Sequence, residues 1–458
     1  MRTRNAGLVA AVLIALSPHP AWGAWKVSDV DIESTMGFYS SVAVDVNLFP
    51  HVFYTNFNGN GLYHSWFSET GWHREQLDKS DGITFVSAAL TADDRPCIAF
   101  ADRVANRVTY LEYWAGRWCG ATIPDVPGTP CHPSLALDRL GRPHIACMGF
   151  GEVLYHSWRD ADSNWHTEVV DRGPYAGWTC SLALDSAGRP HIAHAAYASE
   201  ADRAARRAAI RYASRDAAGW RTTTVTDNAL GSCSLGLDRD GLARICYITR
   251  PTGGTYALVC SAETTRGFLH RVIDQGTAEL GETALRVGPG AWVQIAYSDA
   301  TNGDLKYAVY NGTGWRTETV DSRVNVGQNP SLFVDPKGYT HFSYFDRTDL
   351  RLRYATNLNH APTVTDAALS PESPAPGAPL TMTVNAASDQ DRDALTYEYV
   401  WTAFIGGRWT TPRTLTTGAR VDTLPAGSTA RGQHWQCTVR AFDGLVYSVP
   451  LQCNVTIP

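Results

Sequence analysis

The sequence has little charge and few of the motifs that mark common enzyme classes. Charged residues make up 18 % of the 458 residues, and the formal net charge is −6. A nucleic-acid-binding protein needs a basic surface, so this balance argues against nucleic acid as a partner. The sequence contains no Cys-x-x-Cys pair, P-loop, Gly-x-Gly-x-x-Gly, His-Glu-x-x-His or Ser-His-Asp motif. Zinc ribbons, nucleotide-binding folds and the common hydrolases are therefore not indicated.

The abundant residues point to β-structure. Hydrophobic residues make up 44 %, which is typical of a globular chain, and aromatic residues make up 11 %. Glycine occurs 39 times and proline 24 times. Many aromatic residues combined with many turn-forming residues predict an all-β protein. The length is comfortable for two domains.

The N-terminus predicts export. Arg2 and Arg4 precede a short apolar run, and Ala21 and Gly23 have the small side chains of a cleavage site. We expect residues 1–23 to be a signal peptide and the mature protein to be secreted or periplasmic. The alternative is a buried apolar strand, which the flanking arginines disfavour. No later run is long and apolar enough to predict a transmembrane segment.

Ten cysteines fit an oxidising compartment. Cys233 and Cys246 flank a turn at Asp238, and a two-residue hairpin there would place them opposite each other. Cys437 and Cys453 flank a second turn in a similar way. We predict a disulfide for each pair. The other six cannot be paired from the sequence, and free buried thiols are the alternative for each: Cys97, Cys119, Cys131, Cys147, Cys180 and Cys260.

A segment of thirteen residues recurs along the chain. It reads SLALDSAGRPHIA from Ser181 and SLALDRLGRPHIA from Ser134. The copies lie 46 to 53 residues apart and begin at Ser41, Ser87, Ser134, Ser181, Ser234, Ala284 and Ser331. A second element such as Leu-x-Tyr-Ala follows each copy. In the first six copies a third element comes next, an aromatic residue, then four residues, an aliphatic residue and usually Asp.

Each repeat predicts four antiparallel strands. SLAL alternates with the period of a half-buried strand, Asp-x-x-Gly is a tight turn, and PHIA is the returning strand. The two later elements supply the third and fourth strands. A repeat of about 47 residues with four antiparallel strands is typical of a β-propeller blade.

The last copy lacks a fourth strand, and the N-terminus supplies one. Trp25–Asp31 has the same spacing as Trp315–Asp321, the fourth strand of the preceding repeat. We therefore predict a seven-bladed β-propeller over residues 25–357, closed by the N-terminal strand, which leaves no exposed sheet edge. A parallel β-helix is the alternative, but its shorter repeat does not fit.

The pattern from Trp25 to Thr356 resembles the exported bacterial β-propellers of the broad BNR/sialidase-like group. The resemblance implies a fold and no particular activity. The sialidase Asp-box, S-x-D-x-G-x-T-W, is absent from all seven copies. Some polysaccharide lyases, including ulvan lyases, share a seven-bladed propeller and eliminate across a uronic acid with His and Tyr residues.

The composition changes after His360, where Pro, Ser and Thr increase and the repeat stops. Residues 361–458 contain several strand-like segments and resemble the immunoglobulin-like β-sandwich modules of bacterial exported proteins. Within them, Asp389, Asp391 and Asp393 are spaced two residues apart. Ca²⁺ takes several oxygens from such loops, so these three residues predict a possible calcium site. A solvated turn is the alternative.

We expect the functional site on one face of the propeller. The turns between strands 1 and 2 are uniformly tight, whereas the loops between strands 2 and 3 and the connections between blades vary. Variable loops on a rigid scaffold are where function usually lies, which indicates the 2–3/4–1 face around the central channel. The catalytic candidates are His194, His132, Tyr247 and Arg347. The ligand-binding candidates are Tyr54, Asp102, Arg103, Tyr175, Trp178, Tyr197, Arg203, Tyr297, Asp299, Tyr344 and Asp346.

The residue types suggest chemistry for some of these positions. His194 stands where most copies have Tyr or Phe. A His beside a Tyr could move protons at a sugar, and an Arg could neutralise a carboxylate. A structural hydrogen bond is the alternative. The long loop over residues 197–211 has four arginines that could contact an acidic glycan or form a solvated helical turn. The repeated histidines are expected to make structural hydrogen bonds: His51, His144, His191 and His341.

Two functions fit these observations. The first is an exported binding protein that we expect to be a monomer and that recognises a glycan, a polysaccharide or a surface protein. The alternative is a polysaccharide lyase, or another carbohydrate-active enzyme, acting on an acidic polysaccharide with His, Tyr and Arg in the central channel. The absence of a catalytic motif favours the first, because a fold alone does not define a function.

Overall fold

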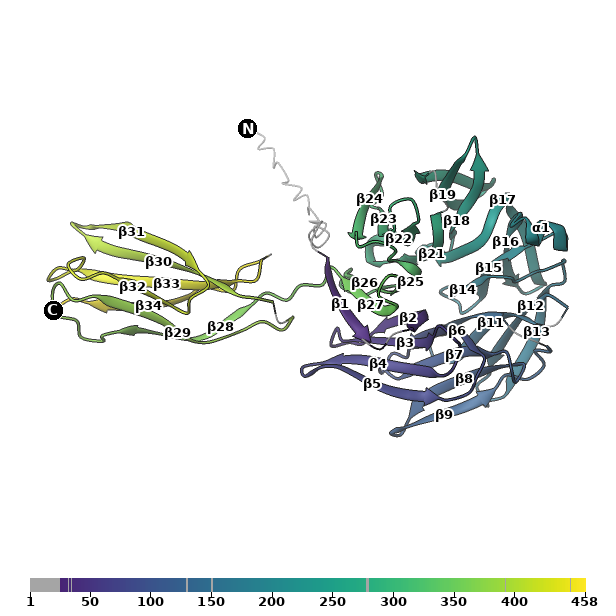
Figure 1. Ribbon diagram of the computed structural model, residues 1–458, viewed down its shortest axis with the longest axis horizontal. Coiled ribbons are helices and arrows are strands. Elements are labelled where there is room, and N and C mark those ends of the chain that lie inside the picture. Colours follow the sequence, from purple (N-terminus) through teal and green to yellow (C-terminus); the bar gives the residue numbers. More distant parts are fainter. Residues whose placement is uncertain are drawn as a thin grey trace, which may run out of the picture. The chain divides into compact units, whose positions relative to one another are not determined.

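The computed structural model describes residues 25–458 apart from 32, 34, 129, 130, 150, 277–279, 392 and 445. The expected signal peptide lies outside the described residues. The described chain consists of strands, with one short helix, α1 (Glu200–Ala204), and one 3-10 turn, η1 (Pro289–Ala291). It divides into two compact units, Met1–Asn357 and Leu358–Pro458 (Figure 1). Within the described residues, no helix is long and apolar enough to cross a membrane.

The described part of the first unit contains five four-stranded sheets and one seven-stranded sheet (Figure 1). The first sheet comprises β2 (Met36–Val44), β3 (Pro50–Asn56), β4 (Leu62–Ser68) and β5 (Gly71–Asp78). The second comprises β6 (Ile83–Leu90), β7 (Pro96–Asp102), β8 (Arg107–Trp114) and β9 (Arg117–Thr122). The third comprises β10 (Cys131–Leu137), β11 (Pro143–Gly149), β12 (Val153–Arg159) and β13 (Trp165–Asp171).

The seven-stranded sheet comprises β14 (Cys180–Leu184), β15 (Pro190–Ala196), β16 (Ala208–Asp216), β17 (Gly219–Leu237), β18 (Ala243–Thr252), β19 (Thr255–Thr264) and β20 (Gly267–Gly276). The next sheet comprises β21 (Leu280–Val287), β22 (Val293–Asp299), β23 (Asp304–Tyr310) and β24 (Trp315–Asp321). The last has the order β1 (Lys26–Asp31), β27 (Arg351–Thr356), β26 (Thr340–Asp346) and β25 (Gln328–Val334). The first unit is therefore all-β and built from blade-like four-stranded units.

Each repeat folds as its sequence predicts. In the fourth repeat Ser181 pairs with Ala193, and Leu184 pairs with Pro190. Asp185 forms the turn between them, because its Oδ1 accepts the backbone N–H of Arg189 at 2.9 Å. Gly188 has a φ of +77°, the left-handed conformation that the Asp-x-x-Gly turn requires.

The N-terminal strand completes the sheet of the last repeat, as the spacing predicts. β1 pairs with β27 in antiparallel register, with Lys26 opposite Thr356. Trp25 packs on Tyr307 and Phe342, with ring centroids 5.4 and 5.1 Å away, and its Nε1 donates to Glu318 at 3.1 Å. The two ends of the repeat region are therefore joined by main-chain hydrogen bonds and by the contact of the half-buried Trp25 with two buried aromatic rings.

The first strands of the repeats lie side by side in a closed ring. In order they are β2, β6, β10, β14, β17, β21 and β25, and β25 is again a neighbour of β2. Serine hydroxyls link most of them: the N–H of Leu285 donates to Ser234 Oγ at 2.6 Å, for example. Five equivalent bonds run from a backbone N–H to a serine Oγ: from Val42 to Ser331, from Ala88 to Ser41, from Leu135 to Ser87, from Leu182 to Ser134 and from Leu235 to Ser181. The sixth repeat has Ala284 at this position, which has no hydroxyl to accept such a bond.

The repeated histidines make hydrogen bonds within their sheets, in agreement with their expected structural role. His51 Nδ1 lies 3.0 Å from His64 Nε2, and His144 Nδ1 lies 3.0 Å from His156 Nε2. In the fourth and last repeats the partners are tyrosine hydroxyls, with His191 bonded to Tyr212 and His341 to Tyr354, each at 2.5 Å. Burial lowers the pKa of His51 to about 3 and that of His144 to about 4.

The predicted disulfides are absent from the structure. All ten cysteines lie in the described residues, and all are free thiols. In the turn at Asp238 the N–H of Asp238 donates to Leu242 O at 3.0 Å, so the loop is one residue longer than the two-residue hairpin. The register shifts accordingly, and Cys246 lies opposite Ser234, one residue from Cys233. The two thiols therefore point to opposite faces of the sheet.

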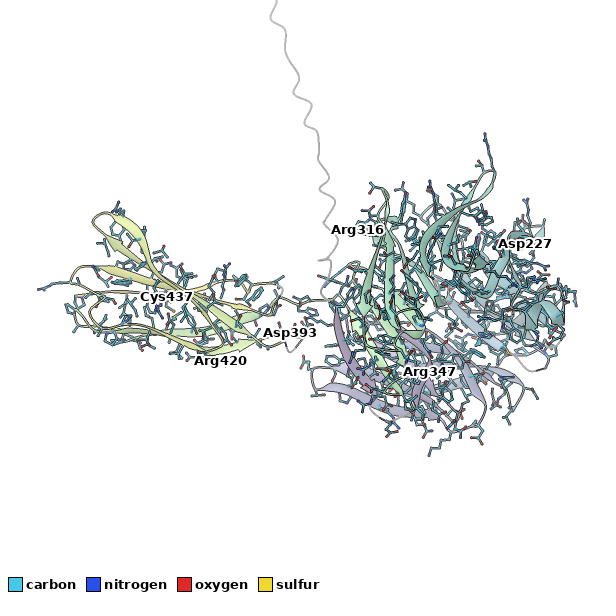
Figure 2. The ribbon with its side chains drawn as sticks, turned by 45° about the horizontal axis from the view of Figure 1, so that its top comes forward. Asp227, Arg316, Arg347, Asp393, Arg420 and Cys437 are labelled. Carbon is cyan, nitrogen blue, oxygen red and sulfur yellow. The ribbon has the colours of Figure 1, made fainter. Side chains whose placement is uncertain are left out.

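Cys437 does lie opposite Cys453, as expected, but both are free. They belong to the second unit, whose two sheets enclose a core with buried Trp401 and Trp435. One sheet comprises β28 (Thr363–Ser370), β29 (Leu380–Ser388) and β32 (Val421–Leu424). The other has the order β31 (Arg408–Thr417), β30 (Thr396–Ile405), β33 (His434–Phe442) and β34 (Leu451–Thr456). Figure 2 labels Cys437 within this unit.

We predict that Ser234→Ala lowers the free energy of unfolding of the first unit by about 1–3 kcal/mol, because it leaves the buried N–H of Leu285 without its acceptor. Ala284→Ser, at the same position of the next repeat, adds the missing acceptor and is expected to stabilise the unit. Thermal and urea unfolding of the two variants measure both effects. Unchanged unfolding of Ser234→Ala would contradict a stabilising role for the serine bonds.

We also predict that acidification destabilises the first unit. The lowered pKa values of His51 and His144 mean that the unfolded chain takes up protons near pH 6.5 while the folded chain does not until about pH 3–4. The neutral histidines therefore stabilise the fold fully above pH 6.5. As the pH falls below 6.5, the free energy of unfolding decreases. The decrease is about 1.4 kcal/mol for each histidine and for each unit by which its pKa differs between the folded and the unfolded chain. Melting curves from pH 7 to 4 test this. A smaller pH dependence is expected for His144→Gln, and an equal one would contradict the explanation.

Candidate functional site

One position of the repeat differs in every copy. It lies two residues before the serine of the first strand, or before Ala284 in the sixth copy. Its occupants are Tyr39, Phe85, His132, Thr179, Ser232, Glu282 and Asn329. The serine two residues later is present in six of the seven copies. The ring of first strands therefore presents the same main chain seven times, but seven different side chains.

The main chain turns these side chains out of the strand ladder. The pairing of first and second strands shifts register here in six repeats, for example between Thr84 and Val86 and between Cys131 and Ser134. Phe85 and His132 have left-handed φ values of 51° and 49°. A bulge of this kind leaves its residue unpaired and redirects the side chain, and it is over-represented beside functional sites.

A pocket of about 340 Å³ lies among these positions. We call it the axial pocket. It is lined by His132, Trp178, Thr179, Tyr197, Arg203, Arg206, Leu230, Gly231, Ser232, Ile248, Gly281 and Glu282. These residues come from the connections between repeats, the starts of first strands, the ends of second strands and the loops that join strands 2 and 3. They thus lie on the face where the variable loops place the expected site.

Arg203 is held in place by two aromatic rings and a carboxylate. Its guanidinium carbon lies 4.9 Å from the ring centroid of Trp178 and 5.5 Å from that of Tyr175. Its Nε donates to Glu200 Oε2 at 2.9 Å, within helix α1. Trp178 in turn lies edge-on to Tyr197, with 6.2 Å between ring centroids. The stacking and the ion pair with Glu200 together fix the position of this guanidinium in the lining of the axial pocket.

The charged groups around the axial pocket influence one another. Burial lowers the pKa of His132 to about 3, and the Arg103 guanidinium acts in the same direction, so this imidazole is neutral. Burial raises the pKa of the Glu282 carboxyl, which Arg206 opposes. Burial also raises the pKa of Tyr39 to about 12, and the Glu282 carboxylate adds to this shift. Tyr39 and Glu282 belong to the first and sixth repeats, so the ring brings distant parts of the chain together.

Four of the predicted residues meet in the axial pocket: His132, Trp178, Tyr197 and Arg203. Tyr175 stacks on Arg203 beside it. Arg103 lines a neighbouring pocket with Tyr39. Arg206, one of the four loop arginines of the sequence analysis, also lines the axial pocket, whereas Tyr39 and Glu282 are site residues that the sequence analysis missed. The signal that would have found Tyr39 and Glu282 is the position of the repeat at which every copy differs.

The predicted tyrosines at the ends of second strands lie in the interior and do not reach a pocket. Tyr54, Tyr297 and Tyr344 are fully buried. Their hydroxyls donate to the aspartates that end the fourth strands of the preceding repeats, which are Asp31, Asp274 and Asp321, at 2.6 to 2.8 Å. They lock adjacent sheets together, because this end of the second strand faces the neighbouring sheet.

His194 occupies the same interior slot. It is fully buried, and its Nε2 lies 3.4 Å from Asp171 Oδ2, which also binds Arg211 at 2.9 Å. Tyr247 is buried too, with its hydroxyl 3.1 Å from Ser261 Oγ. Both of these catalytic candidates are therefore placed between sheets, where the repeat normally has a tyrosine. His194 thus faces Asp171 in a structural position, but within the described residues neither of its ring nitrogens makes a hydrogen bond.

The remaining candidates shape loops. Asp102, Asp299 and Asp346 are buried, and each Oδ1 accepts a main-chain N–H two or three residues later, at 2.8 to 2.9 Å. Arg347 is exposed, and its main-chain N–H donates to Asn325 O at 3.0 Å (Figure 2). None of these four residues is among those that line the axial pocket.

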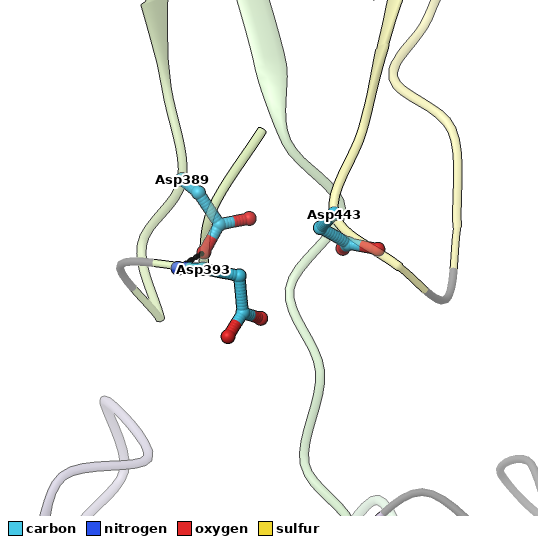
Figure 3. A group of neighbouring side chains, drawn as sticks. All are labelled: Asp389, Asp393 and Asp443. Atoms are coloured by element: carbon cyan, nitrogen blue, oxygen red, sulfur yellow. Dashed lines mark hydrogen bonds between the residues drawn. The ribbon is translucent and has the colours of Figure 1, made fainter. Parts of the chain in front are cut away.

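The second unit has a separate group of carboxylates (Figure 3). Asp389, Asp393 and Asp443 each have a carboxylate oxygen within 4.8 Å of the others. The Asp391 carboxylate binds His360 instead. Its Oδ2 accepts the backbone N–H of His360 at 2.6 Å, and its Oδ1 lies 2.7 Å from His360 Nδ1. Asp389 Oδ1 also accepts the N–H of Asp391 and of Asp393, which forms the turn. Asp443, far along the chain, could not be assigned to this group from local spacing.

No known protein family matches the sequence, and no curated protein is similar to it. In structure the chain is similar to a fungal alcohol oxidase solved with copper, with a TM-score of 0.47 and 13 % identity over 95 % of this chain and 100 % of that one. The Aleuria aurantia lectin gives a TM-score of 0.42 and 12 % identity over 73 % and 96 %. An ulvan lyase gives 0.42 and 11 % over 62 % and 79 %. At these values the likeness does not extend to function.

Proposed function

We propose that the protein is an exported seven-bladed β-propeller followed by an immunoglobulin-like sandwich. The seven-stranded sheet counts as two blades that share β17, whose first half pairs with β16 and whose second half pairs with β18. The closed order of the seven first strands supports this count. The two packed sheets around one core support a sandwich for the second unit, residues 361–458.

We propose further that the first unit binds an acidic saccharide in the axial pocket. The observation behind this proposal is the grouping of Trp178, Tyr197, Arg203 and Arg206 around one pocket. Aromatic faces stack on sugar rings, and arginines pair with carboxylates or sulfates. The volume of about 340 Å³ is at the lower end of the range for small-ligand sites. Seven different side chains on one ring favour a single site over repeated equal ones.

A polysaccharide lyase is the second candidate, because His132, Glu282 and Arg206 line the same pocket. A lyase needs a base to remove a proton and a cation to neutralise the uronate carboxylate. The most effective proton-transfer groups have pKa values near the working pH. The pKa values of His132 and Tyr39, about 3 and about 12, lie far from it on either side. This difference favours binding over catalysis.

We predict that the mature protein is retained on acidic glycans in an array of acidic and neutral saccharides. Arg203→Ala and Arg206→Ala are expected to weaken retention tenfold or more, since a hydrogen bond to a charged group contributes about 1.5–3 kcal/mol. Arg239→Ala, at an exposed turn on the opposite face, is the charge-matched control. A rise in the absorbance of unsaturated uronates would instead support the lyase, and no retention on any saccharide would contradict both.

We also propose that Asp389 and Asp393 bind Ca²⁺ together with Asp443, with Asp391 engaged by His360. Burial and the neighbouring Asp391 and Asp393 raise the pKa of Asp389, so its negative charge is unfavourable without a cation. Ca²⁺ accepts several carboxylate oxygens and would relieve this repulsion.

We predict that calcium chloride raises the melting temperature of the second unit at pH 7. Asp443→Asn should remove most of this shift, because it removes one of the three charges. Asp366→Asn, an exposed change in the same unit, is expected to keep it. An equal calcium shift in the Asp443 variant and the unmodified protein would mean that the carboxylates only shape the turn.

A further inference from the structure

A second pocket, of about 560 Å³, is lined by residues of the first and second repeats. We call it the rim pocket, and its lining includes Phe38, Tyr39, Phe57, Thr84 and Arg103. Phe57 is 54 % exposed, and Phe38 and Tyr39 are half-buried. Large aromatic side chains exposed together beside an arginine are not needed by the core. They mark a surface that contacts a ligand.

A line of aromatic rings connects the two pockets. The ring centroid of Phe38 lies 4.8 Å from those of both Phe57 and Tyr39. Tyr39 lies 4.2 Å from Phe85, and Phe85 lies 3.6 Å from His132, which lines the axial pocket. The rings come from three neighbouring repeats, so the line follows the ring of first strands. We call these five residues the aromatic track.

The walls of the rim pocket are tied together by the main chain. The N–H of Ile83 donates to Gly59 O at 2.9 Å, and the N–H of Arg103 donates to Gly82 O at 3.0 Å. Gly82 has a φ of +83°, and a Cβ there would lie 2.5 Å from Val104 Cγ2. Only glycine allows this close approach of the two loops. A pocket built in this way is preorganised and binds without a large ordering cost.

Arginine side chains lie at both ends of the aromatic track. Arg103 lines the rim pocket, and Arg203 and Arg206 line the axial pocket. Glu282 is the carboxylate in the lining of the axial pocket, near Arg206. A ligand that satisfies both ends needs at least two anionic groups and flat apolar faces between them. A single acidic sugar would occupy one pocket and leave the other end empty.

We propose that the rim pocket, the aromatic track and the axial pocket form one continuous binding track for an extended anionic oligosaccharide, with separate acidic sugars at Arg103 and at Arg203. This inference depends on the saccharide binding proposed above and adds a second subsite to it. A chain of several linked sugars is the ligand that supplies repeated anionic groups at a fixed spacing together with ring faces for stacking. Asn58 and Thr84 supply polar groups for the hydroxyls beside Arg103.

The test uses the whole mature protein and an array of uronate, sulfated and neutral oligosaccharides of defined length, from one sugar to eight. For the acidic series that binds, we expect the affinity to rise at least tenfold between the shortest member and the first that spans both pockets. Titration calorimetry with these members then measures the variants. Arg103→Ala and Arg203→Ala should each weaken the long member tenfold or more, and Arg239→Ala should weaken neither.

The short member separates the two subsites. It should lose affinity in only one of the two variants, because it occupies only one pocket. Arg103→Gln, which keeps the size of the side chain and the main-chain bond to Gly82, serves as a second variant if Arg103→Ala alters the melting temperature. Equal affinity for short and long members, or no effect of either Arg103 variant, would overturn the track and leave saccharide binding intact. No binding to any saccharide, or retention of acidic peptides alone, would overturn both.

Discussion

The structure depends on the hydrogen bond between the serine of one first strand and the main chain of the next. This bond fixes the distance between neighbouring first strands at six places around the ring. Because the serine and the variable position are two residues apart, the same spacing directs seven different side chains to the mouth of the ring. The repeated serine thus keeps the spacing of the first strands constant. The position two residues before it can hold a different side chain in each repeat.

The sequence was sufficient for the strands, the places of the turns and the pairing of the N-terminal strand with the last repeat, since all three follow from the periodicity. It was insufficient where the outcome depended on a shift of one residue in the pairing of two strands. The turn at Asp238 is one residue longer than a two-residue hairpin, and that difference separates Cys233 from Cys246. Tyr54 and His194 have the right position along the strand, but they face the adjacent sheet, which the repeat alone does not reveal.

The site was predicted in part because loops that are long or rich in arginine are visible in a sequence. Trp178, Tyr197 and Arg203 were found in this way, and they lie around one pocket. Tyr39 and Glu282 were not: the variable position of the repeat marks both, but only the fold reveals that they influence each other across the closed ring. Asp443 joins Asp389 for the same reason, through a turn distant in sequence. Long-range neighbours of this kind require the fold.

The pairing of β1 with β27 has a consequence for the order of folding. β1 is among the first segments to be synthesised, yet its partner is more than 300 residues away along the chain. Its hydrogen bonds cannot form until the last repeat exists, and contacts so distant in sequence make folding slow. Until then β1 has no partner, and the sheet of the last repeat ends in an open edge, which is a template for aggregation. A chain interrupted before Arg351 would lack β27 and leave β1 permanently unpaired, so partial products should aggregate rather than persist as smaller closed rings.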